Sequence, residues 1–372
     1  MNRRHFIQMG VAAGLGAGAA TWPETWAQPL QAFQPLKTYG MACGIHVGTQ
    51  AEIAPLHQPD FARFVISNFD MLTAGNELKW GRLRPDPKTF AFSDADWMVN
   101  FAQQNGMLFH GHNLCWNTGN PKWFDSVLNK SNARQFLVDH ITTVMKRYAG
   151  KVDSWDVVNE PLALWNGRPD GLYKGPWLDL LGPEYIDIAF DAAAKADPKA
   201  LLVLNLHHIE QGIPDNEKTR QLSLVLLKQL KQRGVPVQAI GVESHLSATA
   251  PLDPGALDRY FKQVRDMGLQ ILFTEIDIDD TGVPGSTAQR DQVVADYYFR
   301  YLSTAIPASG TSRVIFWTAT DKNNWMEYVR TPQFQRADGA KHRPGLLDES
   351  LQPKLAFSAA AKALQQVCGQ RG

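Results

Sequence analysis

Short apolar runs alternate along the chain with longer segments in which apolar positions recur at a helical period. The longer segments span about 10–18 residues, the usual length of helices in globular proteins. This alternation predicts repeated strand–helix units around a parallel sheet. The predicted strands are Ala42–Val47, Phe69–Ala74, Leu108–Leu114, Ser154–Asn159, Leu201–Leu206, Ala239–Glu243, Ile271–Ile276 and Val314–Trp317.

Helix start and stop signals flank several of the longer segments. Ser131-Asn132 and Asp253-Pro254 are typical starts, and Gly150, Gly234 and Gly268 are typical stops. The clearest predicted helices are Asn132–Ala149, Pro183–Ala196, Asn216–Arg233, Pro254–Met267 and Arg290–Ala305. Eight strand–helix cycles in one run predict an α/β protein with a single (β/α)8 TIM barrel. A doubly wound open sheet is the alternative, which is disfavoured because no Gly-x-Gly-x-x-Gly follows the first strand.

Composition and charge narrow the possible partners. The 372 residues suffice for one barrel of about 250 residues with elaborated loops. Lys+Arg and Asp+Glu each number 37, so no excess charge indicates nucleic acid or an anionic membrane as partner. We therefore expect neither of these partners.

The N-terminal segment has the pattern of a targeting signal. Asn2–Ile7 resembles a twin-arginine signal, Met9–Ala20 is apolar, and Thr25-Trp26-Ala27 is a small-x-small cleavage site. We predict a signal peptide at residues 1–27, a catalytic domain at residues 28–372, and a periplasmic or secreted product. A membrane anchor is the alternative, but the apolar stretch is short and rich in glycine.

The three cysteines form an odd set, Cys43, Cys115 and Cys368. Cys43 and Cys115 fall in predicted strands, where a buried thiol packs as a small apolar side chain. The spacing fits neither a Cys-x-x-Cys motif nor a metal site. The sequence therefore predicts no disulfide.

Two glutamates stand at the ends of predicted strands. Glu160 follows the apolar run Ser154–Asn159, and Pro161 then takes the chain out of the sheet. Glu275 ends a second apolar run in the same way. In parallel barrels the C-terminal strand ends carry the active site, and retaining glycoside hydrolysis uses two carboxylates. For either glutamate alone, an ion pair with a neighbouring Lys or Arg is the alternative.

Six motifs in order carry a family resemblance that spans residues 76–357. They are Asn76-Glu77-Leu78-Lys79-Trp80, Gly111-His112-Asn113-Leu114-Cys115-Trp116, Trp155-Asp156-Val157-Val158-Asn159-Glu160, Ser244-His245-Leu246, Phe273-Thr274-Glu275-Ile276-Asp277 with the later Trp317 and Trp325, and Pro344-Gly345-Leu346-Leu347-Asp348 followed by Pro353-Lys354-Leu355-Ala356-Phe357. The chain thereby resembles glycoside hydrolase family 10, the retaining endo-β-1,4-xylanases. The resemblance implies a barrel fold and β-1,4-xylan or a related decorated β-linked saccharide as substrate.

The resemblance also implies roles for the central residues. Glu160 would be the acid/base and Glu275 the nucleophile, with Asn159 contacting the sugar 2-hydroxyl. His245 would orient Glu275, with Asp277 behind it on the same side of the strand. His245 taken alone is more typical of a satisfied core histidine, and the nearby acid pair is what favours the functional interpretation.

Further residues match the family's substrate-binding set. The set implied for sugar binding is Asn76, Lys79, His112, Trp116, Asn205, Glu243, Trp317 and Trp325. Alternatives remain for single members, because Lys79 could be a surface lysine and the late tryptophans could be core residues. No metal and no cofactor is expected.

The chain departs from the family pattern at several positions. Gly75 stands where the family usually has Glu, Gly119 where it has Gln, and Asn117 where it has His. Glu243 replaces a Gln, Leu206-His207-His208 replaces an Asp-Tyr-Asn run, and Thr318 replaces a Gly. The two glycines would remove polar contacts and open volume, and the changed run would remove an aromatic on the leaving-group side. We therefore expect a conserved reaction with an altered grip on substrate, weaker on linear xylan.

Our prediction is a monomeric, endo-acting retaining β-glycosidase acting on a polysaccharide or oligosaccharide. One alternative is a metal-dependent barrel hydrolase that would use His110, His112, His207, His245 and Asp321. It leaves Glu160 and Glu275 unexplained. The other alternative is a non-catalytic sugar-binding relative, which is disfavoured because both glutamates are present.

Overall fold

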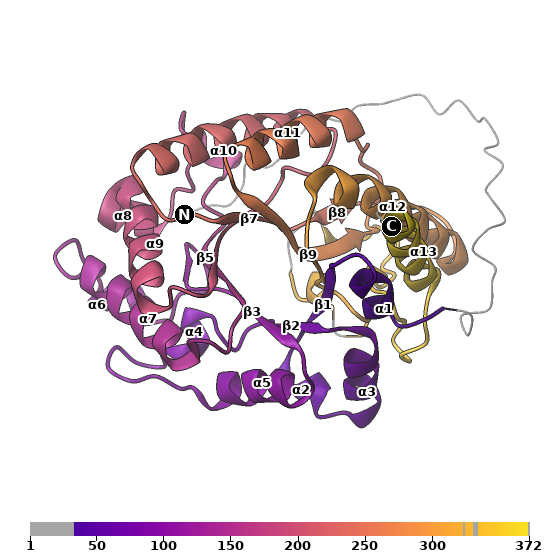
Figure 1. Cartoon of the computed structure of the whole chain (residues 1–372), viewed down its shortest axis with the longest axis horizontal. Coiled ribbons are helices and arrows are strands. Elements are labelled where there is room, and N and C mark those ends of the chain that lie inside the picture. Colours follow the sequence, from indigo (N-terminus) through magenta and orange to yellow (C-terminus); the bar gives the residue numbers. More distant parts are fainter. Residues whose placement is uncertain (1–32, 323, 330–333, 371–372) are drawn as a thin grey trace.

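Eight parallel strands close into a barrel in the computed structural model, which describes residues 33–322, 324–329 and 334–370 (Figure 1). The predicted signal peptide lies outside the described residues. The barrel strands are β1 (His46–Ala51), β2 (Met71–Ala74), β3 (Leu108–Gly111), β5 (Ser154–Asn159), β6 (Leu201–Leu206), β7 (Ala239–Val242), β9 (Gln270–Asp279) and β10 (Arg313–Phe316).

The closure is made by β10, which pairs in parallel with both β1 and β9. This confirms the (β/α)8 barrel and rules out the open sheet. Two short strands, β4 (Cys115–Trp116) and β8 (His245–Ser247), add to the ring by pairing with β5 and β9. They carry Trp116 and His245 toward the C-terminal rim, where the active site of such a barrel lies.

Helices surround the barrel on the outside (Figure 1). The α-helices are α1 (Leu36–Met41), α2 (Ile53–Leu56), α3 (Pro59–Asn68), α4 (Trp80–Leu83), α5 (Ser93–Gln104), α6 (Phe124–Val127), α7 (Ala133–Tyr148), α8 (Pro176–Leu181), α9 (Tyr185–Ala196), α10 (Pro214–Gln232), α11 (Pro254–Asp266), α12 (Thr287–Ser309) and α13 (Leu355–Gly369), and the 3-10 helices are η3 (Leu164–Asn166), η4 (Gly182–Glu184) and η5 (Trp325–Glu327). None of the described helices is long and apolar enough to cross a membrane.

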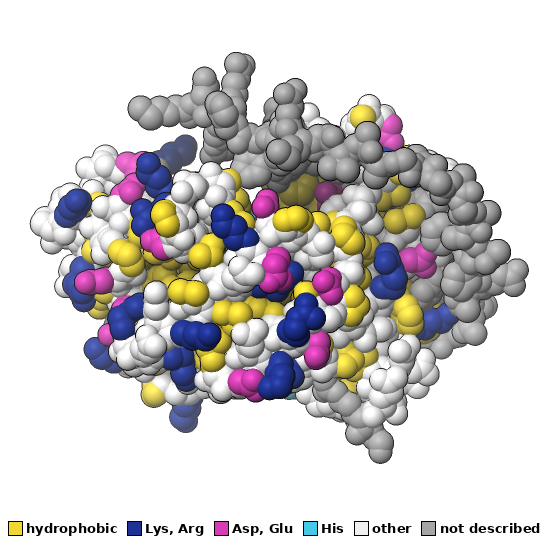
Figure 2. All heavy atoms as spheres, turned by 90° about the horizontal axis from the view of Figure 1, so that it is seen from above, with side chains coloured by type: hydrophobic (Ala, Val, Ile, Leu, Met, Phe, Trp, Pro, Cys, Tyr) yellow, Lys and Arg dark blue, Asp and Glu magenta, His cyan; other side chains and the backbone are white. Residues whose placement is uncertain are grey.

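The predicted helix ends have the expected chemistry. Asp253 caps α11, because its carboxylate accepts a hydrogen bond from the backbone N–H of Ala256. Gly150, Gly234 and Gly268 have φ values of 72°, 75° and 76°, the left-handed conformation that lets a chain leave a helix at little steric cost. On the face drawn in Figure 2, basic and acidic side chains are interspersed, which agrees with their equal numbers.

Two predictions for the N-terminal part were wrong. The first strand begins at His46 rather than Ala42, because Cys43 and Gly44 form a turn in which Gly44 has a φ of 73°. Cys43 also forms a disulfide with Cys368 in α13, whereas no disulfide was predicted. The two cysteines are 325 residues apart, so only the closure of the barrel brings them together. Cys115 is buried and free.

Candidate active site

Glu160 stands where the chain leaves β5. Its φ of 49° is left-handed and uncommon for a residue with a side chain. The backbone N–H of Glu160 donates to the carbonyl of Asn205 (3.1 Å), which fixes this turn to the neighbouring strand. Burial, followed by the negative charge of Glu275, raises the pKa of Glu160 to about 7. A carboxyl with a pKa of about 7 keeps its proton at mildly acidic pH and can act as a general acid.

Glu275 projects from β9 and is 5% exposed. The amide of Asn205 donates to its Oε1 (2.8 Å), and His245 Nε2 donates to its Oε2 (3.2 Å). His112 Nδ1 lies 3.7 Å from Oε1. Burial alone would raise the pKa of Glu275, but the charge of His112 and the hydrogen bond and charge of His245 outweigh it. The pKa of Glu275 therefore lies below its ordinary value, and the group is ionised.

His245 is held between two carboxylates. Its Nδ1 lies 2.8 Å from Asp277 Oδ1 and its Nε2 3.2 Å from Glu275, so both nitrogens must donate. Burial opposes a charged ring, but Asp277 and Glu275 outweigh it and hold the pKa of His245 well above its ordinary value. Asp277 also accepts from Trp325 Nε1 (2.6 Å) and Thr318 Oγ1 (2.9 Å). Thr318 therefore replaces glycine with a hydroxyl that anchors this acid.

Asn205 lies beneath the carboxylates with 0% of its surface exposed. Thr274 Oγ1 donates to its Oδ1 (2.7 Å), which orients the amide so that Nδ2 faces the acids. That Nδ2 donates to Asn159 Oδ1 (2.7 Å) and to Glu275 Oε1 (2.8 Å). The Asn205 amide is thereby committed to protein partners, so Asn205 positions Asn159 and Glu275, and its contact with substrate stays a prediction.

Asp156 is a central residue to which the sequence analysis gave no role. It is fully buried in β5, and its Oδ2 accepts from His110 Nε2 and His112 Nδ1, both at 2.9 Å. His110 also contacts Ser154 Oγ (2.8 Å). A charged residue in the middle of an apolar strand is the signal that could have revealed it. The two imidazoles of His110 and His112 are thus committed to Asp156.

The side chains predicted to hold the glycone sugar converge on one side of Glu275. Lys79 Nζ lies 3.2 Å from Asn76 Oδ1, 5.3 Å from the centroid of the Trp116 ring and 5.8 Å from that of Trp317. Burial lowers the pKa of Lys79, although nearby carboxylates, Glu275 first, oppose the shift. The ammonium group therefore faces the catalytic acids from inside an aromatic cleft, a place unlike that of a surface lysine.

The opposite side of the site carries an aromatic wall. His207 and His208 stack with ring centroids 4.4 Å apart and planes at 5°. Trp165, in η3, meets both rings edge-on and is 41% exposed. Burial lowers the pKa of His207 to about 4, so the neutral ring donates from Nε2 to the Leu162 carbonyl (2.8 Å). The aromatic expected to be missing is therefore supplied by Trp165, which the sequence analysis did not identify because it lies in a long loop.

Glu243 is a third buried acid, 2% exposed, between the other two. One of its carboxylate oxygens lies within 4.8 Å of ligand atoms of Glu160 and His207, and one lies equally close to those of Glu275 and His245. Burial, then the charges of Glu275 and Glu160, raises the pKa of Glu243 well above its ordinary value. Glu243 is therefore neutral when Glu275 is ionised.

The volume expected at the two glycines is not open. A Cβ built on Gly75 would lie 1.9 Å from Nε2 of Gln50, so the Gln50 side chain fills that space. A Cβ on Gly119 would lie 2.9 Å from the Trp116 ring, and Gly119 has a φ of 69°. At both glycines, the missing side chain lets a neighbouring side chain pack against the backbone. Weaker binding of linear xylan stays a prediction. The open volume at the two glycines, on which part of it was based, is absent from the described structure.

The metal alternative is not supported by the arrangement of its residues. Among the described residues, the groups with converging ligand atoms are His112–Asp156–Glu275, Glu160–His207–Glu243, Glu243–His245–Glu275 and Asp279–Asp280–His342. His110 and Asp321 belong to none of them, and Asp321 instead pairs with Lys354 (3.0 Å). Within the described residues, no such group therefore contains more than one of the histidines proposed to share a metal ion.

Comparisons with known proteins give one consistent result. The family model described as glycosyl hydrolase family 10 matches residues 36–363. Endo-1,4-beta-xylanase B of Thermotoga neapolitana is 29% identical over 91% of this chain and 93% of its own length, and beta-1,4-xylanase of Dictyoglomus thermophilum is 31% identical over 82% and 85%. The crystal structure of native xylanase 10B from Thermotoga maritima superposes with a TM-score of 0.80 at 28% identity, covering 90% and 99% of the two chains.

Proposed function

Because the chain belongs to glycosyl hydrolase family 10, we propose that it hydrolyses β-1,4-linked xylan, or a closely related decorated β-linked saccharide, within the chain and with retention. The observation that carries this proposal is the unlike surroundings of two glutamates at the barrel mouth, Glu160 just after β5 and Glu275 within β9. Hydrogen bonds from Asn205 and His245 favour an ionised Glu275, whereas burial and the charge of Glu275 raise the pKa of Glu160. Retaining hydrolysis needs one protonated and one ionised carboxyl at the same site.

In the first step Glu275 attacks the anomeric carbon and forms a covalent glycosyl-enzyme. Glu160 donates its proton to the glycosidic oxygen as the bond to the leaving sugar breaks. The hydrogen bonds from Asn205 and His245 hold the attacking carboxylate in place before the reaction, so little reorganisation is required.

In the second step the ionised Glu160 takes a proton from water, and the resulting hydroxide displaces Glu275. Each displacement inverts the anomeric centre, so the product keeps the configuration of the substrate. Asn159, positioned by Asn205, would bond the 2-hydroxyl of the reacting sugar, a contact that strengthens in the transition state.

The two sides of the site are suited to bind different parts of the substrate, the glycone sugar on one side and the leaving sugar on the other. Lys79, Trp116 and Trp317 are placed to bind the glycone sugar by charge-assisted hydrogen bonds and stacking. Trp165 with His207 offers an exposed aromatic surface to the leaving sugar.

Export and oligomeric state form part of the same proposal. We propose that residues 1–27 direct export to the periplasm or the medium and that the enzyme acts as a monomer. N-terminal sequencing of the mature protein tests the first, and light scattering during gel filtration tests the second.

The experiment that tests the reaction is digestion of xylan, β-glucan and β-mannan by the purified protein. NMR of the first product would show a β-anomer released from xylan as a mixture of short oligomers. An initial α-anomer would contradict retention, and exclusive release of single xylose units would contradict internal cleavage. Cleavage of another backbone alone would contradict the substrate.

A further inference from the structure

One histidine and two glutamates converge at the barrel mouth, and are here called the mouth cluster. A ring nitrogen of His207 and one carboxylate oxygen each of Glu160 and Glu243 lie within 4.8 Å of one another. Glu160 directly follows β5, His207 directly follows β6, and Glu243 directly follows β7. These three strands are neighbours in the sheet and run parallel. The first residue after each strand therefore reaches the same level of the rim, where the three side chains can share one ligand.

His207 has the tautomer and the support of a metal-binding histidine. Its Nε2 donates to the Leu162 carbonyl (2.8 Å), so the neutral ring keeps a lone pair on Nδ1. The ring stacks on His208 at 4.4 Å between centroids and meets Trp165 edge-on at 5.5 Å. Imidazoles that bind metals usually donate their other N–H to a backbone carbonyl or a carboxylate, which fixes the ring. The His207 ring is therefore already oriented and uncharged, as a metal ligand must be.

Glu243 is a buried acid with a weak hydrogen-bond partner. It is 2% exposed, and within the described residues its carboxyl accepts from Asn205 Nδ2 at 3.3 Å. That nitrogen has two hydrogens, and it donates at shorter distances to Asn159 (2.7 Å) and Glu275 (2.8 Å). A buried carboxyl without a strong partner is costly. A cation bound in the mouth cluster would supply that partner.

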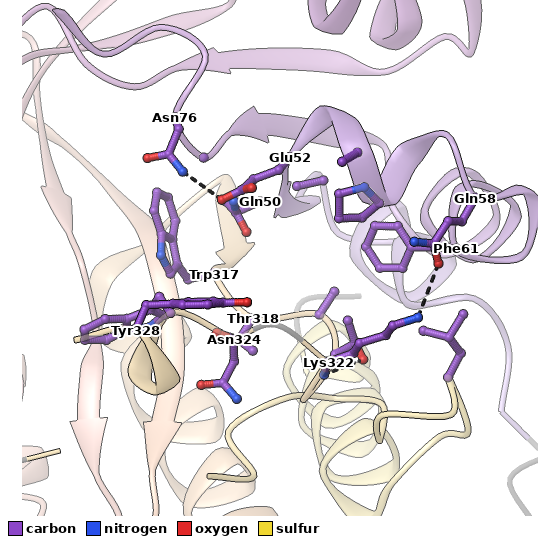
Figure 3. A pocket seen from close by; sticks show the side chains of 18 of the residues that line it. Gln50, Glu52, Gln58, Phe61, Asn76, Trp317, Thr318, Lys322, Asn324 and Tyr328 are labelled. Atoms are coloured by element: carbon purple, nitrogen blue, oxygen red, sulfur yellow. Dashed lines mark hydrogen bonds between the residues drawn. The ribbon is translucent and has the colours of Figure 1, made fainter. Parts of the chain in front are cut away.

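A second glutamate at a strand end shows what sets Glu243 apart. Glu52 directly follows β1, but it is exposed, and its Oε1 accepts from Asn76 Nδ2 at 2.7 Å (Figure 3). Glu52 belongs to none of the groups of converging ligand atoms among the described residues. Position at a strand end is thus not sufficient. Burial and a neighbouring histidine distinguish Glu243.

The ligand atoms of the mouth cluster select a class of ion. An imidazole nitrogen with two carboxylate oxygens suits a divalent transition metal such as Zn²⁺, whereas Mg²⁺ prefers oxygen ligands alone and keeps its water. Zinc ligands stand about 2.0–2.2 Å from the ion, so each atom would move inward by less than about 1 Å. The ion would replace the protons held by the two carboxyls, because ligating carboxyls are deprotonated.

We propose that Glu160, His207 and Glu243 bind one divalent transition-metal ion, with Zn²⁺ as the best fit, and that the bound ion inhibits hydrolysis. Glu160 bound to the ion has no proton to donate to the glycosidic oxygen, and the ion stands where the leaving sugar departs. The inhibition rests on the proposed function, because it assumes that Glu160 is the general acid. The binding of the ion does not depend on that assumption.

The test measures inhibition of xylotetraose hydrolysis by Zn²⁺ after treatment of the enzyme with a chelator and its removal. Each variant is compared with its own rate without zinc. His207→Phe keeps a ring for stacking but removes the ligand nitrogen, and Glu243→Gln keeps the shape but removes the charge. We expect each change to raise the inhibition constant of Zn²⁺ by roughly ten-fold or more. If His207→Phe does not fold, Glu243→Gln decides the question.

Two matched controls lie outside the mouth cluster. His208→Asn removes the neighbouring imidazole, and asparagine tolerates the left-handed φ of 56° at this position. Glu52→Gln makes the same change as Glu243→Gln on the glycone side. Both controls should keep the inhibition constant of the wild type, and Mg²⁺ at the same concentrations should not inhibit. Equal inhibition by Mg²⁺, no inhibition by Zn²⁺, or an inhibition constant unchanged in Glu243→Gln overturns the proposal.

A binding measurement separates this proposal from the proposed function. Calorimetric titration of the protein with Zn²⁺ needs no turnover, and histidines elsewhere on the surface are the same in every variant. If the wild type cleaves no saccharide but binds one zinc ion that both His207→Phe and Glu243→Gln lose, the function fails and the metal site stands. If xylotetraose is cleaved and zinc binding is the same in all three proteins, the metal site fails alone.

Discussion

The surroundings of Glu275 and Glu160 differ although the residue type and the depth in the barrel mouth are similar. Glu275 receives hydrogen bonds from Asn205 and His245 and lies near His112. Glu160 accepts a hydrogen bond from Asn159 Nδ2 (3.3 Å), lies beside the Trp116 side chain, and faces the charge of Glu275. Burial acts on both carboxyls, so the neighbouring imidazoles decide which one ionises.

This difference shows that the protonation of each acid is set by groups behind it. His245 remains charged only because Asp277 and Glu275 flank it. Burial, together with the negative charge on Glu275, then raises the pKa values of Glu160 and Glu243. The assignment of nucleophile and acid therefore depends on a hydrogen-bonded network that spans β6, β8 and β9.

The largest expected loss of activity comes from removing the ionised carboxylate of Glu275. Glu275→Ala should lower kcat on xylan by about 10⁴-fold or more, because the covalent route is lost. Added azide should restore turnover and give a product of inverted configuration. Circular dichroism should match the wild type, and Glu184→Ala, which removes an exposed glutamate, should keep full activity. Near wild-type activity of Glu275→Ala would contradict its assignment.

The loss of rate on removing the Glu160 carboxyl should depend on the leaving group. Glu160→Ala should slow cleavage of xylo-oligosaccharides by roughly 10²–10⁴-fold, because a sugar leaves only with a proton. The glycosylation step of an aryl glycoside with an acidic phenol should change far less. Pre-steady-state bursts on both substrate types measure this step, and equal losses on the two would remove Glu160 from the acid role.

The dependence of kcat/KM on pH should reflect the surroundings of both Glu160 and Glu275. The raised pKa of Glu160, about 7, means that the general acid is present below pH 7 and is lost as pH rises through it. The lowered pKa of Glu275 means that the nucleophile is present above that value and is lost as pH falls. We expect kcat/KM on xylotetraose to fall on the alkaline side near pH 7. An alkaline limb in the ordinary range of glutamate would contradict the raised pKa.

The smallest effect should come from Glu243→Gln. A protonated carboxyl and an amide have nearly the same shape and no charge, so kcat/KM at pH 6 should change by less than about three-fold. The alkaline limb should also stay in place. If Glu243 were ionised, its removal would lower the pKa of Glu160 and shift that limb to lower pH, which titration of the variant would detect.

Much of the fold could be predicted because each barrel strand is short and apolar and each helix has its own end signals. Glu160 and Glu275 could be located for the same reason, since Glu160 directly follows such a strand and Glu275 comes late in another. The first strand was misplaced because the turn that ends at Gly44 contains no polar side chain that would mark it as a turn. Its tip, with Gln50 and Glu52, was therefore not recognised as part of the barrel mouth.

The remaining contacts depend on distances between segments that the sequence does not order. Trp165 reaches His207 through the fold of a long loop, and Gln50 reaches Gly75 across two strands. Glu243 was noticed as a departure, but its neutral state follows only from its closeness to two other acids. Such effects arise from tertiary packing, which local patterns do not encode.

The disulfide between Cys43 and Cys368 encloses every strand of the barrel, from His46 to Phe316, in one covalent ring. A protease that cuts any surface loop between the two cysteines would therefore open the ring without releasing a fragment. The nicked enzyme would keep its mass under oxidising conditions and would separate into two pieces only after reduction. A single cut would thus leave the barrel tied together.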